Sequence, residues 1–294
     1  MTLAGETMGT SWSVRFAAPS GCDASAVEAA IVARLEGINA QMSHWREDSV
    51  ISRYNRAAPG TWIELPTDFA VVIDAALDIA RRSQGAFDPA IGRIVDLRGF
   101  GPDPAGRSED VREIEVARAG GGRRRLCWDR PRLLQPGGLA IDLSGIAKGY
   151  AVDAIADHLG GHGIDHALVE IGGELVGRGV RPDGDPWWVD LEDPPGIALP
   201  RLRIALHGLA VATSGDYRRG AHSIDPASGR SIDNGIRSVS VIHKSAMLAD
   251  AWATALTVLG IERGMALATQ EALAARFVSG VELLSPALTA MLDY

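Results

Sequence analysis

The stretch DLSGIAKGYAVD, residues 142–153, sets Lys148 between Gly145 and Gly149 where a helix is predicted to begin. Glycines let the backbone approach a ligand closely, and free N–H groups at a helix start, together with a lysine, suit a phosphate. The GxxxxGK[ST] spacing of a Walker P-loop is absent. The alternative is a Gly-rich turn that packs a helix on a sheet and leaves Lys148 in solvent.

A second segment of interest lies about one hundred residues further on, where an apolar helix is predicted behind Ser245 as its N-cap. Asp250 and Thr254 are four residues apart in this helix, so both oxygens face the same side. Hard cations such as Mg²⁺ prefer oxygen ligands, and a carboxylate among apolar residues needs a cation or another partner. The spacing therefore predicts a metal site, with a capping or surface carboxylate as the alternative.

Between the two segments, ATSGDY at 212–217 and HSIDPASG at 222–229 combine small hydroxyl residues, glycine and a histidine. Such residues can line a ligand, and His222 is a candidate general base because imidazole titrates near neutral pH. The alternatives are a surface or core histidine and an ordinary Asp-Pro turn. Gly172 and Gly173 follow a predicted strand and indicate a tight turn or a ligand contact.

The rest of the chain mixes predicted helices and strands without regular βαβ alternation, which favours an α+β fold over a doubly wound sheet. Residues 99–138 are rich in Gly, Pro and Arg, so loops and short strands are expected there. Helices are expected from Ser25, in a capping box with Glu28, to Met42, from about Thr67 to Arg82, from Ile146 to Leu159 and from Ala246 to Leu259. Strands are expected over residues 12–16, 141–143, 167–171, 187–191, 202–206, 209–212 and 239–242.

Composition limits the classes of function. The chain has 294 residues, 29 basic and 37 acidic side chains and a net charge of −8, which disfavours nucleic acid and anionic membranes as partners. The basic run Arg123–Arg125 follows three glycines and is expected to be a solvated loop tip. Cys22 and Cys127 are too few for a zinc site, although the sequence is compatible with a single disulfide between them. We expect no membrane span, signal peptide or lipid anchor, and hence a soluble protein.

Taken in order, eight segments resemble the FAD:protein FMN transferase family, also called ApbE. They extend from residue 8 to residue 260 and so cover most of the chain. Each is of limited specificity alone, but their common order is specific. The segments are MGTSW at 8–12, MSHW at 42–45 leading to Ser49 and Asn55, GAFDPAIG at 85–92, DLSGIAKGYAVD at 142–153, LVEIGGE at 168–174, ATSGDY at 212–217, HSIDPASG at 222–229 and ADAWATALTVLG at 249–260.

The resemblance implies an ApbE-like, T-fold-related α+β fold that holds FAD in a cleft between two lobes. It implies one catalytic domain over 1–294, for which we expect a seam between lobes near 99–138. Asp250 and Thr254 match the family's Mg²⁺ ligands, with the carbonyl of Ala147 as a third, and His222 matches the histidine proposed to deprotonate the acceptor. The resemblance also implies that Asp250, like His222, is a catalytic residue. The implied flavin-nucleotide contacts are Met42, Asn55, Asp88, Lys148, Glu170, Gly172, Gly173, Thr213, Ser214 and Gly215. Glu174 stands where many relatives carry aspartate, which keeps the carboxylate but extends its reach by one carbon.

The implied reaction is the Mg²⁺-dependent transfer of FMN from FAD to a Thr or Ser hydroxyl of an acceptor redox protein, through a phosphoester bond and with release of AMP. An FAD pyrophosphatase that yields free FMN and AMP, and a non-catalytic flavin-binding protein, are the alternatives. The start of the chain favours the cytoplasm, whereas the family's habit favours the periplasm.

Overall fold

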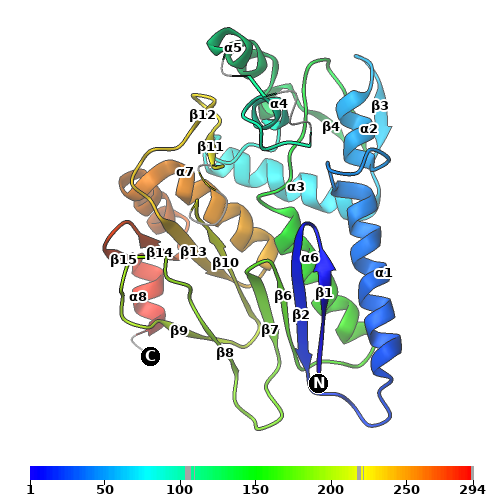
Figure 1. Ribbon diagram of the computed structural model, residues 1–294, viewed down its shortest axis with the longest axis vertical. Coiled ribbons are helices and arrows are strands. Elements are labelled where there is room, and N and C mark those ends of the chain that lie inside the picture. The colour runs from blue at the N-terminus through cyan, green and yellow to red at the C-terminus, as the bar shows by residue number, and fades with distance from the viewer. Residues whose placement is uncertain (103–106, 109, 217–219, 221, 293–294) are drawn as a thin grey trace. The chain divides into compact units, whose positions relative to one another are not determined.

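The computed structural model describes residues 1–102, 107–108, 110–216, 220 and 222–292, and these residues form two compact units (Figure 1). The first unit comprises residues 1–36, 146–220 and 234–294, and the second comprises residues 37–145 and 221–233. Helix α1 (Ala24–Met42) begins in the first unit and ends in the second. The predicted organisation, a single catalytic domain with a seam near 99–138, stays a prediction.

The first unit is built on an eight-stranded antiparallel sheet in the order β1-β2-β6-β7-β10-β13-β14-β15. Mixed helices and antiparallel strands confirm the predicted α+β class. The strands are β1 (Thr2–Thr7), β2 (Thr10–Phe16), β6 (Ala167–Ile171), β7 (Glu174–Arg178), β10 (Leu209–Ser214), β13 (Ser238–His243), β14 (Ala274–Val278) and β15 (Glu282–Leu284).

Helix α6 (Ala147–Gly161) packs on β6 and β7, and helix α7 (Ala246–Gln270) packs on β10 and β13. Leu168, Val211 and Ile242 of the sheet belong to a core cluster with the hairpin β8 (Trp187–Asp190)–β9 (Arg203–Leu206) and with helix α8 (Pro286–Leu292). Successive strand residues face opposite sides, so the sheet is covered on both faces.

Helix α7 begins after Ser245, as predicted, because the Ser245 hydroxyl accepts a hydrogen bond from the N–H of Leu248. It continues beyond the predicted end at Leu259, with a kink at Gly260 (φ 75°, ψ −175°). A glycine tolerates this left-handed φ, so it interrupts the helix without ending it.

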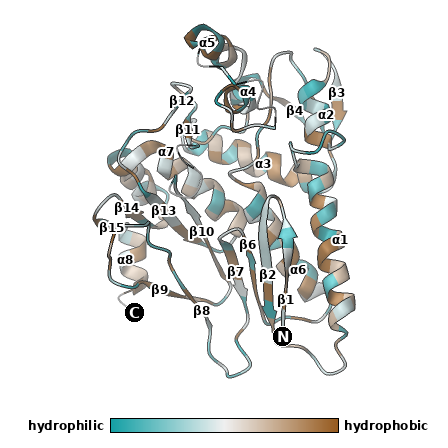
Figure 2. Ribbon diagram, viewed as in Figure 1, coloured by the Kyte–Doolittle hydropathy of each residue, from teal (hydrophilic) through white to brown (hydrophobic). Residues whose placement is uncertain are grey.

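The start of α1 corrects a prediction. The helix begins at Ala24, and the side chain of Asp23 accepts hydrogen bonds from the N–H groups of Ser25 and Ala26. Asp23 is therefore the capping residue in place of the expected Ser25. Figure 2 shows hydrophobic and hydrophilic residues side by side along α1, as expected for a helix with one buried face.

The second unit contains short helices and small sheets, β3-β5-β4 and β11-β12. The expectation of only loops and short strands over 99–138 is wrong, since Asp110 caps a helix whose Ile114 and Ala117 are buried. Residues 141–143, expected to form a strand, have no regular structure. The elements are α2 (Val50–Arg56), β3 (Trp62–Glu64), α3 (Thr67–Arg82), α4 (Gly92–Leu97), α5 (Val111–Gly120), η2 (Arg123–Arg125), β4 (Cys127–Asp129), β5 (Arg132–Leu134), β11 (Ile224–Asp225) and β12 (Arg230–Ser231).

Within the described ranges, every helix is too short or too polar to cross a bilayer. Cys22 and Cys127 are both free thiols.

Candidate functional site

Three charged side chains meet in the first unit where α6 begins. Glu174, at the start of β7, is 2% exposed and pairs with the ammonium group of Lys148. Asp250 of α7 is 5% exposed and accepts a hydrogen bond from the N–H of Gly149 at 3.1 Å. We call Lys148, Glu174 and Asp250 the buried charge cluster. Lys148 is therefore not a solvated side chain, and Asp250 is not a surface carboxylate.

Burial dominates the electrostatics of the two carboxyl groups. It raises the pKa of Glu174, which Lys148 lowers and Asp250 raises further. It also raises the pKa of Asp250, against the opposing effects of Lys148 and of the Gly149 N–H. Two buried carboxylates thus share one lysine, and another cation would lower the cost of keeping both charged.

The residues around Asp250 fit a hard divalent cation. Thr254 lies one turn further along α7 and is half-buried, and Ala147 is the first residue of α6. Oε2 of Glu174 is buried and has no hydrogen-bond partner among the described residues. Those residues contain no group of three or more His, Cys, Asp and Glu side chains that could hold a metal. The donors that Asp250, Thr254 and Ala147 offer are the hard oxygens of a carboxylate, a hydroxyl and a carbonyl group, which suit Mg²⁺.

Asp153 fixes the relative position of α6 and α7. Its carboxylate accepts hydrogen bonds from the Ser245 hydroxyl at 2.6 Å and from the N–H groups of Ala246 and Met247 at 2.9 and 3.0 Å. A carboxylate at a helix N-terminus is favoured by the helix dipole. A Cβ atom on Gly149 would lie 2.2 Å from the carbonyl oxygen of Ala246, so only glycine allows this helix crossing.

The predicted ligand contacts Gly172 and Gly173 form the β6–β7 turn, with φ angles of 64° and 106°. Two consecutive positive φ angles are typical of a tight hairpin turn. The same turn delivers Glu174 to the buried charge cluster. Glu170, on β6, accepts a long hydrogen bond of 3.4 Å from the Ser13 hydroxyl.

Thr213 and Ser214 end β10, and Gly215 follows them. The hydroxyl groups of Thr213 and Ser240 are 2.8 Å apart and hydrogen-bonded to each other. The side chain of Thr213 thus has a partner within the sheet. Tyr217, the last residue of the predicted ATSGDY segment, lies outside the described residues.

In the second unit, Asn55 and Asp88 have structural partners. The Asn55 amide bonds the backbone of Ile141 twice, donating to its carbonyl at 3.0 Å and accepting from its N–H at 2.8 Å. Asp88 accepts from the N–H groups of Ala90 and Arg123, both at 2.9 Å, while burial raises its pKa. Met42, the last residue of α1, is 4% exposed.

His222, the predicted base, precedes β11 and is half-buried. Its ring lies edge-on to Phe100, with 6.4 Å between the ring centroids. The structure therefore gives this histidine an aromatic neighbour within the second unit.

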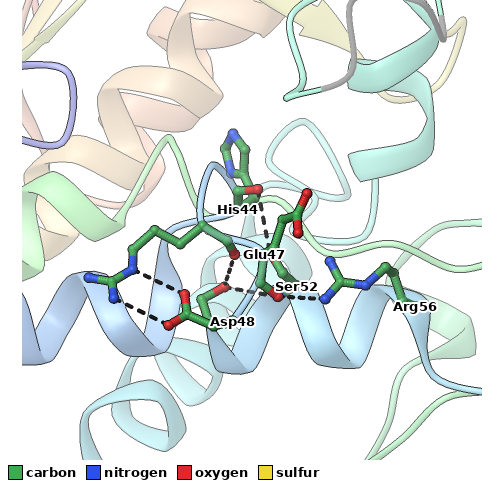
Figure 3. Close-up of polar contacts among 7 residues, drawn as sticks. His44, Glu47, Asp48, Ser52 and Arg56 are labelled. Carbon is green, nitrogen blue, oxygen red and sulfur yellow. Dashed lines mark hydrogen bonds and ion pairs between the residues drawn. The ribbon is translucent and has the colours of Figure 1, made fainter.

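Trp45 lies in the connection between α1 and α2 and is 64% exposed. Polar contacts hold this connection, as Ser52 donates from its hydroxyl to the carbonyl of His44 and Arg56 donates to the carbonyl of Glu47 (Figure 3). Ser49 caps α2 by accepting from the N–H of Ser52. Hydrogen bonds to backbone carbonyl groups therefore hold this connection in place, and the indole ring of Trp45 stays accessible.

The run Arg123–Arg125 forms a short 3₁₀ turn, η2. Arg125 donates to the carbonyl oxygens of Gly120 and Gly137. At least one member of the run is thus tied to the backbone instead of being fully solvated.

The structural importance of Gly149 and Asp153 is not predicted from the sequence. Both lie in the quoted 142–153 segment, but their partners at Ser245 to Met247 are more than ninety residues away. Only the glycine and the carboxylate themselves were available as signals.

The chain is similar to proteins of a known family over most of its length. The profile described as the ApbE family matches residues 8–277. The chain is 39% identical over 280 residues to an FAD:protein FMN transferase of Vibrio cholerae, covering 90% of this chain and 83% of that protein. It is 30% identical over 292 residues to the protein of the same name from Escherichia coli K12, covering 94% and 83% of the two chains.

Two solved structures share the fold. The flavin transferase ApbE from Vibrio cholerae superposes with a TM-score of 0.92 at 35% identity, covering 99% of this chain and 98% of that one. The apo form of the flavinyl transferase ApbE from Pseudomonas stutzeri gives a TM-score of 0.91 at 35% identity, covering 99% and 96%.

Proposed function

Because the chain belongs to the ApbE family, we propose that it is an FAD:protein FMN transferase, an enzyme that moves FMN from FAD to an acceptor protein. Relatives of this name cover most of the chain at 30–39% identity. The structural observation that carries the proposal is the buried charge cluster. A protein that only packed a helix on a sheet would have no need to bury Glu174 and Asp250 beside Lys148.

We further propose that Asp250, Thr254 and the carbonyl of Ala147 hold Mg²⁺. The fit rests on the oxygen donors and on the excess of buried negative charge. When bound, Mg²⁺ would neutralise charge that develops on the leaving phosphate. Lys148 supplies a second positive charge for the pyrophosphate, and Glu174 holds the Lys148 ammonium group in place.

The chemical step is a phosphoryl transfer. The acceptor hydroxyl, on Thr or Ser, attacks the phosphorus on the FMN side, a new P–O bond forms, and the bond to the AMP phosphate breaks. The proton of the hydroxyl passes to His222, and AMP leaves with the bonding electrons. Positioning and electrostatic stabilisation supply most of the acceleration in this class of reaction.

The flavin contacts at Met42, Asn55, Asp88, Lys148, Glu170, Gly172, Gly173, Thr213, Ser214 and Gly215 remain part of this proposal. Asn55, Asp88 and Thr213 each have a partner within the protein. A contact with FAD would therefore use the remaining capacity of these groups or require them to exchange partners. The location of the protein, cytoplasmic or periplasmic, stays a prediction.

The test is incubation of the purified protein with FAD and MgCl₂, with and without an acceptor redox protein that carries a Thr or Ser flavinylation motif. AMP release together with in-gel flavin fluorescence of the acceptor supports the transferase. AMP with free FMN only, whatever acceptor is supplied, favours an FAD pyrophosphatase. Intact, bound FAD would make the protein a flavin binder and overturn the proposal.

A further inference from the structure

Two histidines lie one turn apart at the C-terminal end of α6. His158 is within the helix and His162 follows its last residue. Their ring centroids are 4.4 Å apart and their planes are inclined by 48°. Residues four apart share one face of a helix, so both rings project from the same side of α6.

The hydrogen bonds of the pair leave ring nitrogens available. Nδ1 of His162 lies 2.8 Å from the carbonyl oxygen of His158, a contact that requires the proton on Nδ1. Nε2 of His162 then carries a lone pair. Nε2 of His158 is buried and has no hydrogen-bond partner in the described part of the chain. Burial, His162 and Arg34 all lower the pKa of His158, which favours the neutral ring.

The pair borders a cavity of about 180 Å³ between α1 and α6. Apart from the two imidazoles the lining is apolar, with Val27 and Ala30 from α1 and Leu159 from α6. A water molecule occupies about 30 Å³ in the liquid, so the cavity has room for several. An apolar lining offers those waters few partners, whereas a bound cation would hold them in place.

We propose that His158 and His162 form a binding site for a divalent transition-metal cation of the imidazole-preferring class, such as Zn²⁺, Ni²⁺ or Cu²⁺. Two imidazoles that share one metal, with bonds of about 2.0–2.1 Å, have ring centres on the order of 4.5–5 Å apart, close to the separation seen here. The hydrogen bond from Nδ1 of His162 to a carbonyl is the usual way in which a metal-binding histidine is oriented. Water completes the coordination from the cavity.

This site differs in chemistry from the proposed Mg²⁺ site. Imidazole nitrogen suits Zn²⁺, Ni²⁺ and Cu²⁺, whereas carboxylate, hydroxyl and carbonyl oxygens suit Mg²⁺. The positive charge of Arg34 near His158 opposes a cation and keeps the affinity modest. The inference does not depend on the proposed transferase activity.

The test is titration of the full chain with ZnCl₂ by isothermal calorimetry at pH 7.5, with saturating MgCl₂ present throughout. We expect one Zn²⁺ to bind per chain. His162→Ala and His158→Ala should each weaken binding by at least about tenfold, since loss of a ligand costs more than loss of an orienting group. His207→Ala is the matched control, because His207 is exposed and also bonds a carbonyl, that of Gly179, through Nδ1.

A second readout uses CuCl₂ and electron paramagnetic resonance, in which hyperfine splitting counts the coordinating nitrogens. Two nitrogens in the wild type and one in His162→Ala support the site. His162 is exposed, so its replacement leaves the core intact. Zn²⁺ affinity unchanged in His162→Ala, or weakened as much in His207→Ala, would overturn the proposal.

Discussion

At the scale of single residues, the position of Asp250 is explained better by chemistry than by stability. Its carboxylate is buried and accepts a hydrogen bond from the backbone N–H of Gly149. Glu174 is buried nearby with one oxygen unpaired in the described residues. Two buried carboxylates that share one lysine destabilise a fold unless a further cation compensates them. Such residues are expected where stability has been exchanged for activity.

Replacing Asp250 should therefore separate activity from stability. Asp250→Asn removes the charge and keeps the shape, so FAD turnover, measured as AMP release in Mg²⁺, should fall to background. Without Mg²⁺ its melting temperature should equal or exceed that of the wild type, because a buried charge is gone. Asp157→Asn, on an exposed carboxylate of α6, is the control and should change neither quantity. Full turnover in Asp250→Asn would remove Asp250 from the site.

His158 should make stability depend on pH. Its folded-state pKa is below the ordinary value of 6.5, through burial first and then His162 and Arg34. A depressed pKa means that the unfolded chain binds the proton more readily. The contribution of His158 to stability is thus complete above pH 6.5 and is lost as the pH falls through the folded pKa.

The measurement is the melting temperature at pH 7.5 and pH 5.5 in EDTA, for the wild type and His158→Gln. The loss on acidification should be smaller in the variant, since glutamine does not titrate. His162→Gln serves as comparison, because the exposed neighbour contributes repulsion but little burial. An equal loss in His158→Gln and the wild type would contradict the assignment.

Some of these residues could be identified from sequence and others could not. Ser245 was predicted as an N-cap because its partner, the N–H of Leu248, is three residues away. The sequence also predicts that Asp250 and Thr254 face the same side of their helix, because helical spacing is a local property. The pairing of Lys148 with Glu174 was not predicted, since it depends on which strand lies beside α6. No periodicity in the chain encodes that contact.

At the scale of elements, residues of α6 set the position of α7. Gly149 lets the helices approach, and Asp153 caps the start of α7 from α6. The same crossing brings the N–H of Gly149 to Asp250. Small changes in the crossing would therefore move the carboxylate relative to Lys148.

Gly149→Ala should separate the two helices. The new methyl group would lie 2.2 Å from a backbone oxygen of Ala246, and backbone cannot rotate away as a side chain can. We expect destabilisation of about 2 kcal/mol or more by chemical denaturation, together with reduced FAD turnover. Gly161→Ala on the same helix, where a Cβ meets nothing within 4 Å, should change stability by less than about 1 kcal/mol. Equal effects of the two substitutions would refute the close-packing argument.

Asp153→Ala should weaken the start of α7. It removes three hydrogen bonds to a charged acceptor, and we expect a loss of roughly 2–3 kcal/mol in the free energy of unfolding. Asp157→Ala, whose side chain is 75% exposed, should stay within about 0.5 kcal/mol of the wild type. Denaturant titration of the two variants in parallel measures the difference. If Asp153→Ala lowers the free energy of unfolding by less than about 0.5 kcal/mol, Ser245 alone caps the helix.

Elements were predicted well where periodicity is strong and poorly where it is short. Helix α3 and strands β6 and β13 lie within a few residues of their expected positions. Helix α5 was missed because its Gly- and Arg-rich surroundings indicated loops. Only Ile114 and Ala117 are buried in it, so its apolar face is too small to be recognised.

At the scale of the whole molecule, the chain order conceals the architecture. The first unit is assembled from residues 1–36, 146–220 and 234–294, and the second unit is inserted within it. The antiparallel sheet pairs β2 with β6 across more than 150 residues. Local patterns supply the α+β class, but the strand order comes from such distant pairings and was not predicted.

Ligand binding should be visible in the stability of the whole molecule. A ligand that binds only the folded state at about 100 times its Kd adds roughly 2.7 kcal/mol. For a chain of this length that corresponds to an increase of about 4–5 °C in melting temperature. We expect this increase with FAD and MgCl₂ together, measured by calorimetry, and a smaller one with FAD in EDTA. Asp250→Asn should lose the part that depends on Mg²⁺ and retain the rest. An identical increase with and without Mg²⁺ in the wild type would place the cation outside the flavin-binding equilibrium, and the proposed Asp250–Thr254–Ala147 ligand set would fail.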